Sequence, residues 1–118
     1  MLTCGLAKWS DMISPWFKKL LAETNRKVVP RRKQWEAIST IQTFKERGLL
    51  KPGSSGLVFA VGAEWLPSFF VSKGCKILTT DLSIKDKNAK HWIASGQICA
   101  DASKINNIDK VNLNDNAE

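Results

Sequence analysis

The sequence lacks several features that would assign it to a familiar class of protein. It contains no stretch of 18 or more apolar residues, so it predicts no transmembrane helix. The N-terminus also lacks the apolar stretch of a secretory signal peptide, because Lys8, Asp11, Lys18 and Lys19 interrupt it. We therefore expect a cytoplasmic protein.

Residues that bind metals or form disulfides are scarce and isolated. Cys4, Cys75 and Cys99 are widely spaced and form no CxxC pair, which argues against both a disulfide framework and a zinc site. Cys75 opens an apparent strand, so we expect it to act as a small apolar core residue. The single histidine, His91, has no partner at metal-ligand spacing and is expected at the surface or satisfied in the core. The sequence therefore predicts no metal.

Acidic residues are few in the first half of the chain. Residues 1–51 hold 11 Lys and Arg against 4 Asp and Glu, whereas residues 52–118 hold 7 of each. This asymmetry is compatible with a nucleic-acid or membrane contact, or with the solvated faces of helices. The cluster Arg31-Arg32-Lys33 has no interleaved aromatic residues, which weakens the nucleic-acid interpretation. A small basic module that binds nucleic acid or a partner protein stays open as an alternative.

Two helices are predicted in the basic half. Ser14 and Pro15 are typical of the N-cap and first residue of a helix, which we expect to run to about residue 24. A second helix is predicted over residues 32–47, and Gly48 ends it. Its expected buried side consists of Trp35, Ile38, Ile41 and Phe44.

The stretch at 56–82, GLVFAVGAEWLPSFFVSKGCKILTTDL, predicts the central unit of the fold. A buried strand is expected over residues 57–61, followed by Gly62 and a helix over residues 64–73. Gly74 fits the left-handed position that ends such a helix, and a second strand is expected over residues 75–80. Asp81 follows that strand directly. A βαβ unit of this order places the helix N-terminus and the carboxylate at one edge of a parallel sheet.

The chemistry of that edge suits a cofactor that carries a nucleoside. Gly62 allows a ligand to approach the backbone, and Asp81 lies 19 residues later, close to the offset of about 20 residues at which such an acid reaches ribose hydroxyls. An ordinary βαβ unit with a turn glycine and a solvated aspartate is the alternative. A nicotinamide-dinucleotide enzyme is disfavoured, because the loop has one glycine where that motif has three, and Glu64 would repel a pyrophosphate.

Four stretches together resemble the N-terminal part of bacterial class I S-adenosylmethionine-dependent methyltransferases. They are RKQWE at 32–36, GLLKPG at 48–53, GLVFAVGAEWLP at 56–67, and Thr80-Asp81. In that group an R-K-x-W-E helix precedes a first motif close to G-L-G-F-G-V-G-x-E-x-L-P. The likeness covers about residues 31–100. It implies an α/β protein with an incomplete Rossmann-like methyltransferase fold, in which N-terminal helices precede the βαβ unit.

The resemblance also implies a cofactor and the residues that bind it. S-adenosylmethionine would meet the loop at Phe59, Ala60, Val61, Gly62 and Glu64, and Asp81 would hold its ribose hydroxyls. A carboxylate suits that role because its hydrogen bonds to hydroxyls are charge-assisted. Methyl transfer from a sulfonium needs no metal, and such enzymes chiefly position the acceptor in line with the methyl group.

The chain departs from the family at one residue and in length. Ala60 stands where the family usually has the first glycine, and a methyl group is unwelcome there if the backbone needs a positive φ. The later strands and the acceptor-site residues are missing, so the methyl acceptor and the catalytic residues stay unknown. We expect a truncated domain, inactive alone, whose sheet is completed by self-association or by a partner chain. The expected division is a helical extension at 1–30, the partial cofactor-binding domain at 31–102 and a polar tail at 103–118.

Overall fold

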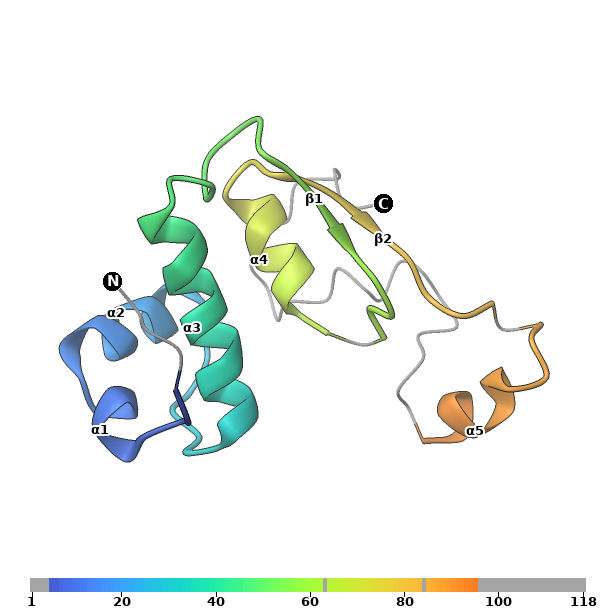
Figure 1. Cartoon of the computed structure of the whole chain (residues 1–118), viewed down its shortest axis with the longest axis horizontal. Coiled ribbons are helices and arrows are strands. Elements are labelled where there is room, and N and C mark those ends of the chain that lie inside the picture. Colours follow the sequence, from blue (N-terminus) through green and yellow to red (C-terminus); the bar gives the residue numbers. More distant parts are fainter. Residues whose placement is uncertain (1–4, 63, 84, 96–118) are drawn as a thin grey trace. The chain divides into compact units, whose positions relative to one another are not determined.

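The computed structural model describes residues 5–62, 64–83 and 85–95, which belong to two compact units (Figure 1). The first unit extends to Leu50 and the second begins at Lys51. The described residues form five helices and one two-stranded parallel sheet. The chain is therefore a mixed α/β protein in which helices precede a βαβ unit, as the sequence predicts. None of the helices in these residues is both long and apolar enough to cross a membrane.

The first unit contains helices α1 (Trp9–Met12), α2 (Pro15–Glu23) and α3 (Arg32–Glu46). Helix α2 begins at Pro15, directly after the predicted N-cap Ser14, because proline's missing N–H costs nothing in the first turn. The Ser14 hydroxyl makes no capping bond to α2 and donates instead to the carbonyl of Asp11. Ser14 therefore links the end of α1 to the start of α2. The short α1 was not predicted.

Apolar side chains of α1, α2 and α3 form the core of the first unit. Six side chains are almost completely buried: Met12, Phe17, Leu20, Leu21, Ile38 and Ile41. The spacing of Ile38 and Ile41 places both on the predicted buried side of α3. That side is less buried at its ends, where Trp35 is half-buried and Phe44 is exposed. The Trp35 indole donates to Asp11 Oδ2 at 3.2 Å, which connects α3 to α1.

The second unit contains, in chain order, strand β1 (Ser55–Val58), helix α4 (Leu66–Ser72) and strand β2 (Lys76–Thr79). The strands are parallel, and Ser55 pairs with Lys76 and Val58 with Thr79. The first strand was predicted over residues 57–61, which is wrong at both ends. It stops at Val58 because Ala60 and Gly62 have left-handed φ angles of 50° and 53°.

Helix α4 ends as predicted at Gly74, which has a φ of 84°. The Gly74 N–H donates to the Val71 carbonyl at 2.8 Å and the Cys75 N–H to the Phe70 carbonyl at 3.1 Å. These two bonds form a Schellman motif, which satisfies carbonyls that the end of a helix leaves unpaired. The helix starts at Leu66, two residues after the predicted start, and Pro67 occupies its first turn.

One face of the sheet packs against α4 (Figure 1). Ile77 of β2 is buried there with Phe69 and Val71 of α4, and Cys75 is a buried core residue as expected. On the other face, Leu57 and its partner Leu78 are 52% and 51% exposed. Among the described residues of the second unit, apolar side chains are therefore buried on one side of the sheet only.

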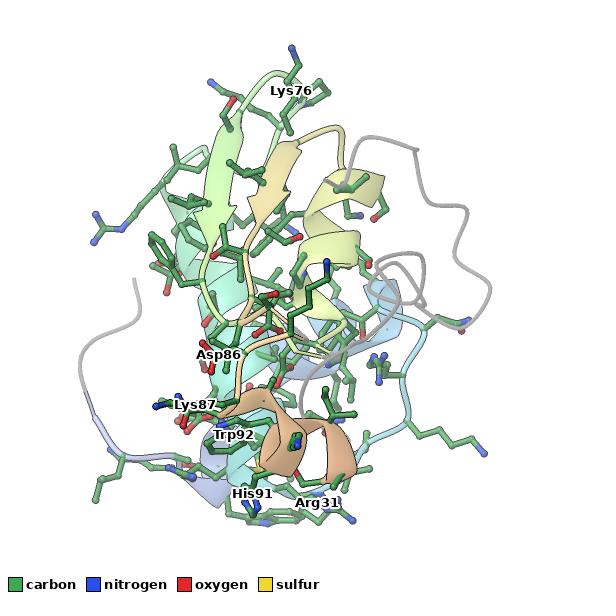
Figure 2. All side chains as sticks on the ribbon, turned by 90° about the vertical axis from the view of Figure 1, so that its right-hand side faces the viewer. Arg31, Lys76, Asp86, Lys87, His91 and Trp92 are labelled. Atoms are coloured by element: carbon green, nitrogen blue, oxygen red, sulfur yellow. The ribbon has the colours of Figure 1, made fainter. Side chains whose placement is uncertain are left out.

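The apolar residues Trp92 and Ile93 predict a last helix over residues 85–94. The observed helix, α5 (Ala89–Ala94), is shorter. Asp86 Oδ1 accepts the Asn88 N–H at 2.7 Å, and this turn occupies the place of the expected first helical turn. His91 lies on the surface of α5 with its ring edge-to-face against Trp92 (Figure 2).

Several predictions fall on residues that the structure does not describe. They are the polar tail at 103–118, the cysteines Cys4 and Cys99, and the end of the predicted cofactor-binding domain at residue 102. The division of the chain at residue 30 likewise stays a prediction.

Candidate functional site

The carboxyl ends of the two strands continue side by side beyond the sheet. The Thr80 N–H donates to the Val58 carbonyl at 2.8 Å, and the Val61 N–H donates to the Thr80 carbonyl at 3.1 Å. In a regular parallel ladder Ala60, not Val61, would make that second bond. One extra residue is therefore accommodated in the loop after β1, and Ala60 takes the left-handed conformation that allows it.

The loop after β1 is fastened to the acid after β2. The Gly62 N–H donates to Asp81 Oδ2 at 2.7 Å, so the residues predicted to share one edge of the sheet are in direct contact. Asp81 Oδ1 accepts the Leu82 N–H at 2.7 Å. Among the described residues, each carboxylate oxygen thus binds one backbone donor, which leaves it a second acceptor position for a ligand hydroxyl. The Asp81 side chain is exposed, which leaves it accessible to such a ligand.

Ala60 has a left-handed backbone conformation, which glycine adopts more readily than other residues. Its φ of 50° makes it one of two non-glycine residues with positive φ in the described chain, the other being Asn25. A left-handed conformation costs an L-residue about 1–2 kcal/mol, because Cβ approaches the following carbonyl oxygen. The loop retains this conformation because Val61, only 1% exposed, anchors it in the core.

The other two predicted loop residues have solvent-facing side chains. Phe59 is 73% exposed, and Glu64 is exposed while its N–H donates to the Val61 carbonyl at 3.1 Å. The structure thus brings Val61, Gly62 and Asp81 together by hydrogen bonds and packing. Phe59 and Glu64 border the same loop and reach outward.

Two contributors to this edge were not assigned roles from the sequence. Thr80 holds the loop twice, since its carbonyl accepts from Val61 and its hydroxyl donates to the Val58 carbonyl at 3.3 Å. The Leu82 N–H orients the Asp81 carboxylate. Thr80 and Leu82 flank Asp81 in the sequence, and this position next to the acid after a strand is the signal that could have identified them. Within the described residues, no three His, Cys, Asp or Glu side chains gather as a metal site would require.

The edge can bind and orient a ligand that carries neighbouring hydroxyl groups. A carboxylate held by two backbone donors has a fixed orientation, and vicinal hydroxyls can donate to its two oxygens together. The neighbouring loop offers backbone groups at Ala60 and Gly62. No protein-family model matches the sequence, and no curated protein or solved structure is significantly similar to it.

Proposed function

We propose that this chain is the N-terminal part of a class I methyltransferase with a Rossmann-like fold, and that it binds S-adenosylmethionine. The supporting observation is the 2.7 Å hydrogen bond from Gly62 N–H to Asp81 Oδ2. It joins the glycine loop and the strand-end acid at the carboxyl edge of a parallel βαβ unit, where open α/β sheets bind their ligands. The methyl acceptor and the catalytic residues remain unassigned.

In this proposal the Asp81 carboxylate accepts hydrogen bonds from the two ribose hydroxyls. Each oxygen uses the acceptor position that its bond to the Gly62 or Leu82 N–H leaves available. The backbone of Ala60, Val61 and Gly62 approaches the methionine part of the cofactor, with Phe59 and Glu64 beside it. The bound cofactor supplies an electrophilic methyl group. The described residues would hold and orient that group, and a partner or further sequence would supply the acceptor site.

Calorimetry on the purified chain tests the proposal. We expect heat of binding with S-adenosylmethionine and S-adenosylhomocysteine, and at least about tenfold weaker binding by Asp81→Ala. Hydrogen bonds to a charged group contribute about 1.5–3 kcal/mol each, so losing them exceeds the 1.4 kcal/mol that corresponds to tenfold.

Asp86→Ala is the matched control, because Asp86 also follows β2 and also accepts a backbone N–H, that of Asn88. Its affinity should equal that of the wild type. The proposal fails if the wild-type chain, shown to be folded by circular dichroism, gives no heat with either ligand. Equal affinity of Asp81→Ala and wild type would contradict the assignment of Asp81.

The second candidate function is a non-catalytic basic module that binds nucleic acid or a partner protein. The exposed residues Arg31, Arg32 and Lys33 favour it. Glu36 reduces their effective charge, since its carboxylate lies 3.3 Å from Arg32 and 3.4 Å from Lys33. The cofactor-binding proposal therefore accounts for more of the described structure.

Salt dependence separates these two candidates. Binding driven by phosphate contacts weakens steeply with ionic strength, since each neutralised phosphate of duplex DNA contributes about −0.9 to the slope of log K against log salt. A titration with a short DNA duplex at two salt concentrations measures that slope. S-adenosylhomocysteine binding should change little over the same range, whereas a steep fall would indicate that charge dominates it.

A further inference from the structure

In the part of the chain that the structure describes, the outer edge of β1 has backbone groups that pair with no other strand. The Lys76 N–H donates to the Ser54 carbonyl and the Thr80 N–H to the Val58 carbonyl, both at 2.8 Å. In a parallel ladder these bonds turn the peptide groups of alternate residues toward the neighbouring strand. The N–H and C=O groups of Ser55, Leu57 and Phe59 therefore point away from β2. Among the described residues, β1 pairs with no strand other than β2.

This edge lacks two common protections against strand addition, a charged side chain and a proline. Residues 55–59 read SGLVF, without a charged residue or proline. The side chains beside the open backbone are also accessible, with Leu57 52% and Phe59 73% exposed. An uncharged edge with accessible apolar side chains is a template for pairing with another strand.

The edge of β2 is different. The Cys75 N–H donates to the Phe70 carbonyl at 3.1 Å, and the Cys75 thiol lies 3.6 Å from the Lys51 carbonyl, so the start of that strand is already engaged. Figure 2 shows Lys76 at the same end of the strand. A lysine on an edge strand opposes the addition of another strand. Strand addition is therefore favoured at β1.

We propose that two copies of this chain pair through their β1 strands, antiparallel and about a two-fold axis at Leu57. In this register Leu57 faces Leu57 of the second copy, and Ser55 faces Phe59. The second copy fits because the strand is self-complementary: no charges meet, and the small Ser55 leaves room for the large Phe59. The result is a continuous four-stranded sheet. The proposal does not depend on the cofactor-binding site.

The interface is short, so the dimer is weak. Stable interfaces bury about 1,600 Å², much more than one short strand pair supplies, and we expect a dissociation constant on the order of 0.1 mM. Sedimentation of the full chain over a concentration range should therefore show a shift from monomer to dimer. A chain that stays monomeric at millimolar concentration would overturn the proposal.

Backbone pairing is tested by Leu57→Pro. The Leu57 N–H points outward, so proline removes the donor that the second copy needs and leaves the ladder to β2 intact. We expect at least tenfold weaker dimerisation, whereas Leu57→Thr, which keeps the N–H, should weaken it less. Leu78→Thr is the control for association through the apolar face, because Leu78 is equally exposed and lies on β2. If Leu78→Thr weakens dimerisation as much as Leu57→Pro does, the copies associate through the exposed apolar face of the sheet, and the proposal of pairing through the β1 edge is wrong.

A cross-link tests the register even if the proline variant fails to fold. Directly opposed residues in a hydrogen-bonded antiparallel pair have Cα atoms about 5.5 Å apart, within the disulfide range. Leu57→Cys, in a chain that also carries Cys4→Ser and Cys99→Ser, should form a disulfide-linked dimer under mild oxidation. Leu78→Cys in the same background should not. Equal cross-linking of the two variants, or none in Leu57→Cys, would contradict the proposed register.

Discussion

At the scale of single residues, the candidate site depends on one acid and one strained alanine. Asp81 fixes the Gly62 loop through a charge-assisted hydrogen bond of 2.7 Å. Ala60 stores strain in the same loop, at a φ of 50°. Backbone strain of this kind gathers at ligand-binding sites, because the surrounding structure must hold it in place. Both residues can be tested by substitution.

Replacing Ala60 by glycine should stabilise the protein. The substitution removes about 1–2 kcal/mol of left-handed strain, and glycine's greater freedom in the unfolded chain offsets about 0.4–1 kcal/mol of that gain. We therefore expect the free energy of unfolding, measured by urea titration with circular dichroism, to rise by about 0.5–1 kcal/mol.

The control for this prediction is Ala22→Gly, at an exposed position of α2. It should lower the free energy of unfolding by up to about 1 kcal/mol, since glycine is a poor helix former. A destabilising Ala60→Gly would show that Ala60 does not need the left-handed conformation.

At the scale of elements, glycine positions decide where α4 ends and how it connects to β2. Gly53 and Gly74 have nearly equal left-handed φ angles, 86° and 84°, and the Gly53 N–H donates to the Gly74 carbonyl at 3.2 Å. Their surroundings differ. A Cβ on Gly74 would lie 3.0 Å from Cα of Pro52, whereas a Cβ on Gly53 would meet nothing within 4 Å.

Gly74→Ala should therefore destabilise the protein more than Gly53→Ala. Both substitutions carry the left-handed cost of about 1–2 kcal/mol, and Gly74→Ala adds overpacking against the Pro52 backbone, typically 1–3 kcal/mol. The difference in unfolding free energy between the two variants, from urea titration, should be at least about 1 kcal/mol. Equal losses of unfolding free energy in the two variants would mean that Pro52 moves away from the new Cβ at no energetic cost.

The sequence predicted elements where local signals agree. Pro15 starts α2, Gly74 ends α4, and the apolar spacing of Ile38 and Ile41 identifies the buried side of α3. Each of these signals acts within a few residues of where it is read. Chain order then sufficed to predict a parallel βαβ unit, because a helical crossover joins parallel strands.

The element boundaries that failed depend on interactions the pattern does not contain. The apolar run 57–61 suggested a strand to residue 61, but it ends early because Ala60 is left-handed, so that Val61 instead of Ala60 donates to the Thr80 carbonyl. The expected helix from residue 85 is shortened by the Asp86 turn. Asp86 competes with helix formation because its side chain satisfies a nearby backbone N–H.

At the scale of the whole molecule, the sequence indicated the site better than it indicated the sheet surface. The order of strand, glycine loop, helix, strand and acid predicted that Gly62 and Asp81 lie at one edge, and they are hydrogen-bonded there. An apolar strand read in isolation does not tell which of its faces is covered. The exposure of Leu57 and Leu78 follows from α4 packing on the opposite face, so it required the structure.

The central claim is that the edge formed by the Gly62 loop and Asp81 binds an adenosyl cofactor. Titration of the isotopically labelled chain with S-adenosylhomocysteine, followed through its amide NMR signals, tests this directly. We predict saturable shifts of the Gly62 and Leu82 amides, whose N–H groups hold Asp81, while Asn25 and Gly74 stay unchanged. A folded chain whose Gly62 and Leu82 signals do not move at millimolar ligand would contradict the account.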